Sequence, residues 1–343
     1  MQTSAISSVS PAKSLRARFA LMTGISGLLF GGAVTGILEW RLETFTFNTQ
    51  QHALKIAANE ISGELASDLR ARKREIALTA GLLEKTRPAD AAEIRALLEK
   101  LKQEQPSYAW IGLTDSSGKV LAATGQQLEG RDVAARPWFH AAQKGVYLGD
   151  PHSAAPPAGY LPVPADAEPA RFVDVAVPLR AANGKLQGVL AAHLHWAWVK
   201  KAIDRVVSEL ESPFPLQFFI ADRNGQLLLA PPGESAKSLA ELMQSKRGAE
   251  QYLTALSAVP AAERASGLGW SVLARQSMHD IMVPIRHIRD LMLWLTLALG
   301  CAFVLFTWVV SKRVVRPIAG FARDVRNFQP DSVEPFRTAA ESR

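Results

Sequence analysis

Two stretches of the chain, residues 19–38 and 291–310, contain no charged residue, and they constrain the fold more than any other feature. Each is 20 residues long. A helix of that length rises about 30 Å, which is the thickness of the hydrocarbon core of a bilayer. The first stretch is too long for a signal peptide and has no small-residue cleavage site, which favours an uncleaved anchor. We therefore predict two transmembrane helices, at residues 19–40 and 291–311.

The distribution of charge predicts the orientation of these helices. The net charge is +7, yet the part between the two stretches is nearly balanced, with 29 basic and 28 acidic residues. Three basic residues and no acidic one precede the first stretch, and seven basic and four acidic residues follow the second. Basic residues beside a membrane helix mark its cytoplasmic side. We therefore expect cytoplasmic segments at 1–18 and 312–343, an extracytoplasmic part at 41–290, and no nucleic-acid partner.

The single cysteine of the chain, Cys301, lies within the second apolar stretch. The extracytoplasmic part therefore has no disulfide and must be stabilised by its own hydrophobic core. Exported domains without disulfides are typical of the bacterial periplasm. We expect a two-pass protein of the bacterial inner membrane, with both termini cytoplasmic and the large middle part periplasmic.

Apolar residues recur at helical spacing from residue 41 to residue 86 and predict one long helix. "TRPAD" interrupts this helix with a proline, and "AAEIRALLEKLKQ" predicts a further helix. The long helix is either the backbone of a globular domain or the seam of a dimer, and the two interpretations are compatible. The recurring positions are Leu54, Ala58, Ile61, Leu65, Leu69, Ile76, Ala80 and Leu83.

The pattern then changes to strands and turns. "AWIGLTDSSGKVLAATG" consists of an apolar strand, a four-residue turn and a second apolar strand, which is typical of a hairpin. "FFIADRNGQLLLAPP" repeats this order about a hundred residues later, with Asp222 in the place of Asp115 and Gly225 in the place of Gly118. The aspartate is expected to bind turn amides, and the glycine to accept a positive φ.

Further apolar strands follow each hairpin. "RFVDVAVPL" and "LQGVLAAHLHW" come after the first, and "GWSVLARQS" comes after the second. The repeated order predicts two related α+β lobes in tandem, at residues 87–210 and 211–285.

Four segments carry a resemblance to a known family: "IGLTDSSGKVLAATG", "GRDVAARPWFHAAQKG", "YLGDP" and "VDVAVPLRAANGKLQGVLAAHL". Together with the anchored long helix, they resemble the double Cache (dCache) sensor domains of bacterial chemoreceptors, sensor kinases and diguanylate cyclases. The resemblance covers residues 41–285 and is most specific over 107–200. It implies an α+β fold in which a long N-terminal helix carries a membrane-distal and a membrane-proximal PAS-like lobe with antiparallel sheets, between two transmembrane helices. It also implies a homodimer.

The segment "SKRVVRPIAGFARDVRNF" after the second apolar stretch resembles the first helix of a HAMP signal-transfer module. Proline disfavours helical geometry in the residue before it, so Pro317 predicts a break between the membrane helix and a cytoplasmic helix. A complete HAMP module has a second helix, and the sequence stops at "TAAESR". We therefore expect the chain to be the input module of a longer receptor.

The resemblance also implies a ligand site in "RPWFHAAQKGVY" and its surroundings. In Cache receptors for amino acids, an R-x-W-[Y/F] element binds the ligand carboxylate through its arginine and walls the pocket with its aromatic residues. These roles fall on Arg136, Trp138 and Phe139. Tyr147 and Asp174 are then the expected partners of the ligand amine. A guanidinium binds a carboxylate through two parallel hydrogen bonds, and a carboxylate suits an ammonium.

The chain departs from this element at two positions. Phe139 stands where tyrosine is usual, and Arg131 replaces a tyrosine five residues before Arg136. The ligand is therefore either an amino acid or another small anion. A core element with a surface ion pair is the alternative interpretation of the motif, and Trp110 on the facing strand fits a core and a pocket equally well.

The expected function is that of a receptor input module, which binds a small anionic or zwitterionic ligand and signals through the HAMP helix. We expect no cofactor, no metal and no enzymatic activity in the chain itself. His193 and His195 lie on one face of a strand, but no third residue follows at a spacing typical of a metal site. One alternative is the sensor part of a diguanylate cyclase or histidine kinase whose catalytic domain lies beyond residue 343. The other is an anchored interaction protein without a small ligand.

Overall fold

The computed structural model describes residues 15–86, 90–153, 171–210, 212–244, 252–260 and 268–326. The chain forms two compact units. The first, here called the helical unit, combines Met1–Thr46 with Met282–Arg343, and the second, the sheet unit, is Phe47–Ile281. Helix α1, Leu15–Thr86, contributes to both units.

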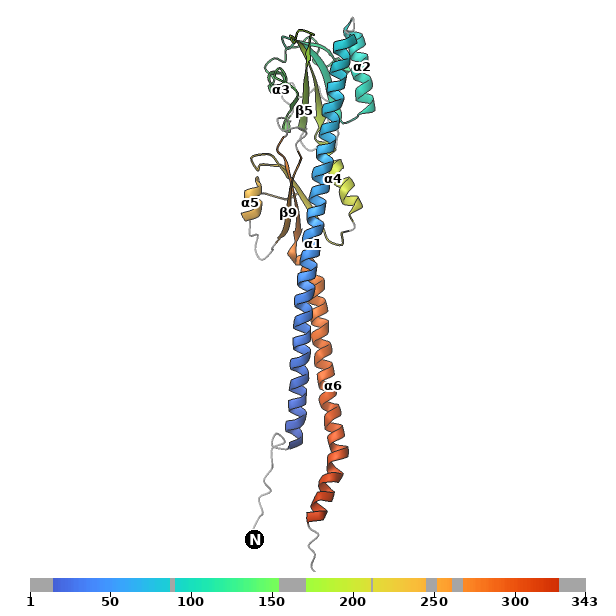
Figure 1. Cartoon of the computed structure of the whole chain (residues 1–343), viewed down its shortest axis with the longest axis vertical. Coiled ribbons are helices and arrows are strands. Elements are labelled where there is room, and N and C mark those ends of the chain that lie inside the picture. The colour runs from blue at the N-terminus through green and yellow to red at the C-terminus, as the bar shows by residue number, and fades with distance from the viewer. Residues whose placement is uncertain are drawn as a thin grey trace, which may run out of the picture. The chain divides into compact units, whose positions relative to one another are not determined.

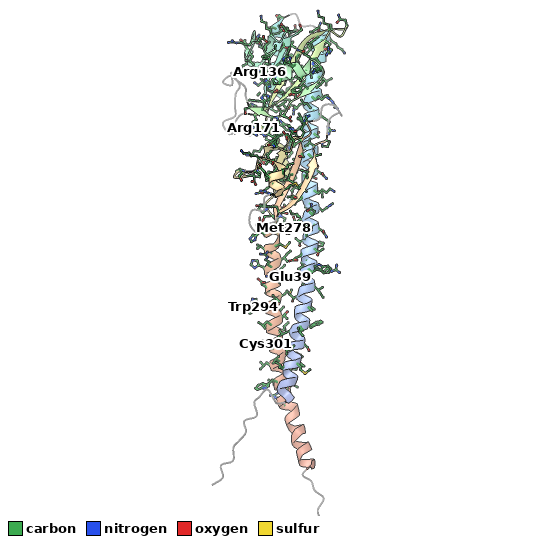
Figure 2. The ribbon with its side chains drawn as sticks, turned by 90° about the vertical axis from the view of Figure 1, so that its left-hand side faces the viewer. Glu39, Arg136, Arg171, Met278, Trp294 and Cys301 are labelled. Atoms are coloured by element: carbon green, nitrogen blue, oxygen red, sulfur yellow. The ribbon has the colours of Figure 1, made fainter. Side chains whose placement is uncertain are left out.

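The helical unit contains the two predicted membrane helices, within α1 and within α6 (Met278–Arg326). Both helices include a stretch long and apolar enough to cross a membrane. Large apolar side chains such as Phe30 and Phe306 are exposed along these stretches. Trp294 and Cys301, also exposed, project from α6 (Figure 2). Exposed apolar surface on such helices is the surface that a membrane span presents to lipid.

Glycines allow the two helices of this unit to approach closely. A Cβ atom added at Gly31 would lie 2.3 Å from Cγ2 of Thr296, and one added at Gly24 would lie 2.6 Å from Cγ2 of Val304. Neither distance is sterically possible without a shift. Small residues at contacts of this kind are typical of packed membrane helices.

Helix α6 runs without interruption through Pro317 and ends at Arg326. The prediction of a helix break at Pro317 is therefore wrong. Proline removes one main-chain hydrogen bond and strains the turn before it. The hydrogen bonds of the turns on both sides keep the helix continuous. Residues 327–343, the rest of the predicted HAMP segment, lie outside the described residues.

The part of α1 from Phe47 onward is the central helix of the sheet unit. All eight positions predicted from helical spacing are buried, with exposed fractions of 6% or less. Ser62 Oγ lies 2.8 Å from Oγ of Ser257, and the Tyr108 hydroxyl donates a 2.6 Å hydrogen bond to Oε2 of Glu75. These contacts join α1 to strands of both lobes. They confirm the interpretation of this helix as the backbone of a globular domain.

The distal lobe is built on an antiparallel sheet in the order β2-β1-β6-β5-β3, with β4 also paired to β5. Helix α2 (Ala91–Glu104) lies with α1 on one side of this sheet, and the short helix α3 (Pro137–Ala142) lies on the other (Figure 1). A 3-10 turn, η2 (Thr124–Gln126), follows β2. The strands are β1 (Tyr108–Asp115), β2 (Val120–Ala123), β3 (Tyr147–Leu148), β4 (His152–Ser153), β5 (Arg171–Arg180) and β6 (Leu186–His195).

The proximal lobe contains a second antiparallel sheet, in the order β8-β7-β10-β9. Helix α4 (Ala197–Glu209) connects the lobes, and α5 (Leu239–Gln244) packs on the sheet through Leu242, which meets Phe219 and Leu273. The strands are β7 (Gln217–Ala221), β8 (Leu227–Leu229), β9 (Tyr252–Ala258) and β10 (Ser271–Ser277). The predicted α+β fold, a long helix with two antiparallel lobes, is confirmed.

The two predicted hairpin turns have the same geometry. In each, one side-chain oxygen of the aspartate, Asp115 or Asp222, accepts hydrogen bonds from the main-chain N–H groups two and four residues later. The glycines take positive φ angles, 98° at Gly118 and 78° at Gly225. This confirms that the repeated sequence order encodes the same turn in both lobes.

Candidate functional site

Three neighbouring strands of the distal sheet place Trp110, His193 and Asp174 side by side. Trp110 on β1 pairs with His193 on β6, and His193 pairs with Asp174 on β5. Directly paired residues point their side chains to the same face of a sheet. The row therefore presents an indole, an imidazole and a carboxylate on one face.

The Trp110 indole is completely buried at one end of this row. Its Nε1 donates a 3.2 Å hydrogen bond to the main-chain oxygen of Gln127, and its ring stacks on His193 with the centroids 5.0 Å apart. Gly112 leaves room for the indole, since a Cβ atom there would lie 2.1 Å from Cζ2 of Trp110. Trp110 is thus a core residue that also holds the plane of the His193 ring.

Helix α3 covers the same face. It begins after the N-cap residue Arg136, with Pro137 at its first position, where the missing N–H costs no hydrogen bond. Trp138 and Phe139 are 3% and 2% exposed and form one core cluster with Trp110. The Trp138 ring meets the edge of His193 at a centroid distance of 6.2 Å.

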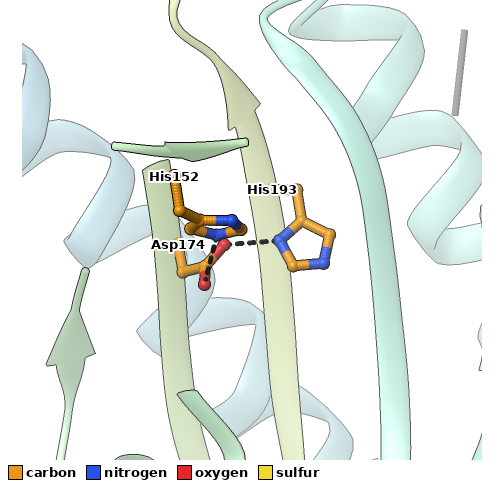
Figure 3. A group of neighbouring side chains, drawn as sticks. All are labelled: His152, Asp174 and His193. Atoms are coloured by element: carbon orange, nitrogen blue, oxygen red, sulfur yellow. Dashed lines mark hydrogen bonds and ion pairs between the residues drawn. The ribbon is translucent and has the colours of Figure 1, made fainter. Parts of the chain in front are cut away.

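Asp174 accepts hydrogen bonds from two imidazoles, one on each carboxylate oxygen (Figure 3). His193 Nδ1 lies 2.5 Å from Oδ1, and His152 Nε2, from strand β4, lies 2.9 Å from Oδ2. The side chains of Asp174 and His193 are only 6% and 12% exposed, whereas that of His152 is 41% exposed. The group is therefore buried at its centre and open to solvent on the His152 side.

Electrostatics keep Asp174 ionised in spite of its burial. Burial by itself raises the pKa of the carboxyl, but the charge of His193 and the hydrogen bonds from His152 and His193 lower the pKa to about 2. The hydrogen bond to Asp174 raises the pKa of His152, while burial and the positive charge of Arg136 lower it. Arg136 is therefore close enough to act on the imidazole of His152.

Tyr147 lies on the short strand β3, which pairs with β5 at Ala176. Its ring is partly buried against the core cluster of Trp138 and Phe139. Burial and the nearby charges of Asp174 and Asp150 raise the pKa of the Tyr147 hydroxyl. The hydroxyl therefore remains protonated and available as a hydrogen-bond donor.

The structure thus brings five of the six predicted site residues onto one face of the distal sheet. The sixth, Arg136, is the N-cap residue of α3, and its positive charge acts on His152. Sequence reasoning missed His152 and paired His193 with the wrong partner, His195. The side-chain ligand atoms of His152, Asp174 and His193 all lie within 4.8 Å of one another, as a metal site requires. The five residues on the sheet face are Trp110, Trp138, Phe139, Tyr147 and Asp174.

One sequence signal could have found the Asp174–His193 pair. The turn at residues 181–185 is centred on Asn183, which lies nine residues after Asp174 and ten before His193, so the turn predicts their pairing to within the register shift between Leu179 and Arg180. His152 gave no such signal, because its strand is two residues long and a segment outside the described residues separates it from β5.

Two antiparallel lobes in tandem along one helix, with an apolar helical stretch before and after them in the sequence, define a tandem PAS-like domain. The sequence model of the Cache domain family, dCache_1, matches residues 44–285, which is well over half of the chain. The chain therefore belongs to the double Cache family of sensor domains. No curated protein sequence matches the chain.

Several solved structures are similar to the chain. The ligand-binding domain of the Pseudomonas fluorescens chemoreceptor CtaA in complex with L-leucine is 15% identical with a TM-score of 0.50, covering 71% of this chain and 99% of that chain. For the same domain with L-serine, the identity is 16%, the TM-score 0.50 and the coverage 69% and 99%. The ligand-binding domain of the Pseudomonas aeruginosa PAO1 amino-acid chemoreceptor PctB with L-Arg is 19% identical with a TM-score of 0.49, covering 69% and 97%.

Proposed function

We propose that the chain is the input part of a transmembrane receptor whose distal lobe binds a small extracytoplasmic ligand carrying a carboxylate. One observation supports this most. The ionisable side chains of Asp174 and His193 are buried in a face otherwise made of aromatic and small apolar residues, and the charge of Arg136 acts on their neighbour His152. Charged groups are costly to bury unless they serve a paired or functional role.

The chemistry of Arg136 favours a carboxylate. Its guanidinium presents a planar set of donors that matches two carboxylate oxygens at once. Trp138 and Phe139 supply the apolar wall that ligand sites combine with a few polar groups. The Tyr147 hydroxyl adds a donor on the same face.

The need for a ligand amine is a separate question. The CtaA and PctB domains are complexes with α-amino acids, which makes an amino acid one candidate ligand. In the present chain, however, Asp174 already accepts hydrogen bonds from His152 and His193. An ammonium group would have to share or displace these donors. This favours a ligand whose carboxylate contributes more to binding than its amine.

We further propose that the conformational change caused by ligand binding is transmitted through α6. Strand β10 ends at Ser277 and α6 begins at Met278, so the proximal lobe joins the second apolar helix without a loop. The protein then spans the bacterial inner membrane twice as a homodimer, with cytoplasmic termini and a HAMP helix after the second span. A ligand drives such a device only through different affinities for two conformations. Catalysis, by a cyclase or kinase domain, would belong to a segment beyond residue 343.

A thermal-shift screen of the purified chain in detergent tests the ligand class. The panel pairs each L-amino acid with its deaminated acid and with its decarboxylated amine, for example L-leucine, 4-methylpentanoate and 3-methylbutylamine. A ligand at a hundred times its Kd stabilises the fold by about 2.7 kcal/mol. We expect at least one acid to raise the Tm and its amine to have no effect. Stabilisation by an amine as large as that by its acid would contradict the proposal.

A further inference from the structure

Each ring nitrogen of His152 lies within hydrogen-bond distance of an oxygen atom. Its Nδ1 lies 2.9 Å from the main-chain oxygen of Ser153, and its Nε2 lies 2.9 Å from Oδ2 of Asp174. The main-chain oxygen of Ser153 can only accept a hydrogen bond, so Nδ1 of His152 is the donor of that contact. A neutral imidazole has a single N–H and can donate to only one of the two oxygens. When Nδ1 carries that N–H, Nε2 of the neutral ring faces Oδ2 of Asp174 with a lone pair, as a metal ligand does.

The arrangement of the other groups fits a metal ion. His193 Nδ1 approaches Oδ1 of the same carboxylate at 2.5 Å, and the ligand atoms of all three side chains lie within 4.8 Å of one another. An ion at the centre of this group would reach both nitrogens and the carboxylate at once. Figure 3 shows the two imidazoles approaching Asp174 from neighbouring strands.

The surroundings hold both imidazoles in the orientation that a metal needs. Metal-bound histidines commonly donate their second N–H to a carbonyl, which fixes the tautomer. Ser153 provides that carbonyl for His152. The ring of His193 is stacked on Trp110 and forms T-shaped contacts with Trp138 and with His152, with centroids 5.0, 6.2 and 6.2 Å away. These aromatic contacts therefore hold the orientation of the His193 ring, as the Ser153 carbonyl holds that of His152.

We propose that His152, Asp174 and His193 form a binding site for a divalent transition-metal ion of the zinc class. Two imidazole nitrogens and one carboxylate oxygen suit Zn²⁺ and its neighbours, whereas Mg²⁺ and Ca²⁺ prefer oxygen ligands only. Zn²⁺ held by three side chains keeps a further coordination position for water or a ligand oxygen. The site goes beyond the proposed carboxylate ligand, and it is tested with the metal alone.

The charges around the site give the metal a role. Without it, the carboxylate of Asp174 opposes the carboxylate of a ligand that approaches Arg136. A bound dication reverses the sign of the cluster, so that the metal and Arg136 both attract an anion. The positive charge of Arg136 acts on His152 and therefore opposes a cation bound there. A bound anion between Arg136 and the metal would relieve this repulsion.

Zinc binding by the full chain, purified in detergent without a polyhistidine tag and stripped with a chelator, tests the site. Isothermal titration with ZnCl₂ at neutral pH should give one ion per chain, and MgCl₂ or CaCl₂ should give no binding. Cobalt should bind as well, with the visible absorption of a nitrogen–oxygen site. Changes in the second shell of a metal site lower the affinity about 10- to 100-fold, so removing a ligand should cost at least about 100-fold.

Three variants make the test specific. His152→Ala changes a half-exposed side chain and Asp174→Asn keeps the shape of a buried one, and both should lower the zinc affinity by at least that factor. His195→Ala, on the same strand as His193, is the matched control and should bind zinc as the unchanged chain does. Melting curves and CD spectra of the metal-free variants identify any loss of folding. If Asp174→Asn does not fold, the zinc affinity of His152→Ala decides the test.

Absence of stoichiometric zinc binding would overturn the proposal. Equal zinc affinity of the His152→Ala variant and the unchanged chain would also overturn it, by placing the ion elsewhere. Neither result would affect the proposed carboxylate ligand, which is measured separately in the chelator-treated chain.

Discussion

The indole Nε1 of Trp270 donates a 2.9 Å hydrogen bond to Oδ1 of Asp150 and so joins the two lobes. Trp270 is buried and directly precedes strand β10 of the proximal sheet. Asp150 lies in the distal lobe, two residues before His152. The segment that carries His152 is therefore tied to the strand that continues into α6.

A double-mutant cycle on this pair tests the connection between the lobes. Trp270→Phe keeps the aromatic ring and removes the donor, and Asp150→Ala removes the acceptor. A hydrogen bond to a charged group contributes about 1.5–3 kcal/mol when buried and less when one partner is exposed, as Asp150 is. Urea unfolding of residues 41–285, a fragment without cysteine, should give a coupling free energy of about 0.5–1.5 kcal/mol. Additive effects of the two substitutions would contradict the link.

Trp138 should be a main determinant of distal-lobe stability. It is 3% exposed and packs against Trp110, Phe139 and His193. Trp138→Ala should lower the free energy of unfolding by about 3–5 kcal/mol, because a cavity replaces a buried indole. Leu121→Ala, at an exposed position of the same sheet, is the control and should change it by no more than about 0.5 kcal/mol. Equal effects of the two substitutions in urea unfolding would show that α3 is not part of the core.

The ion pair of Arg95 and Glu129 should make the distal lobe sensitive to acid. The nitrogen–oxygen distances are 2.8 and 2.7 Å. The hydrogen bond with Arg95, assisted by the N–H of Ala123, lowers the pKa of Glu129 below 4.5 against the effect of burial. A carboxyl whose pKa is lower in the folded state stabilises the fold above its unfolded pKa. This contribution is lost as the pH falls through the folded pKa.

Glu129→Gln should therefore lower the Tm clearly at neutral pH, and the difference should shrink as the pH falls through the lowered folded pKa of Glu129, where Glu129 itself becomes protonated. Glu104→Gln, at an exposed position, is the matched control. Melting curves of the two variants and the unchanged fragment across this range provide the measurement. A Tm difference for Glu129→Gln that stays constant with pH would show that the ion pair does not contribute through its charge.

Cysteine labelling in intact cells tests the topology. In a Cys301→Ser background, cysteines introduced at Asp115 and Asp222 should react with a reagent that does not cross the inner membrane. A cysteine at Val325 should react only after the membrane is permeabilised. The basis is the surplus of basic residues outside the two apolar stretches. Reaction of all three positions from the same side would contradict a two-pass protein with cytoplasmic termini.

The elements that could be predicted from the sequence are those whose pattern is local. The spacing from Leu54 to Leu83 predicts the buried face of α1, because helical periodicity repeats within a few residues. Asp115 and Asp222 predict their turns for the same reason, since each aspartate bonds main-chain groups only two and four residues away.

The parts that could not be predicted depend on contacts between distant residues. His152 reaches Asp174 because β4 pairs with the start of β5, and a two-residue strand has no pattern of its own. His195 shares a strand face with His193, yet its ring packs on Phe172 at a centroid distance of 5.1 Å. Periodicity places both histidines on one face, but the strand register alone decides which of them meets the carboxylate.

The most direct test of the account is the affinity of Arg136→Ala for the acid found in the thermal-shift screen, measured by isothermal titration. Losing the partner of a buried charge costs about 2–5 kcal/mol, which corresponds to a roughly 30- to 4,000-fold weaker Kd. Arg136→Lys should recover little of this loss, because an ammonium does not reproduce the two-point contact. Lys144→Ala, at an exposed position of the same segment, should bind as the unchanged chain does. An unchanged Kd for folded Arg136→Ala would contradict the assignment of the distal lobe as a carboxylate-binding site.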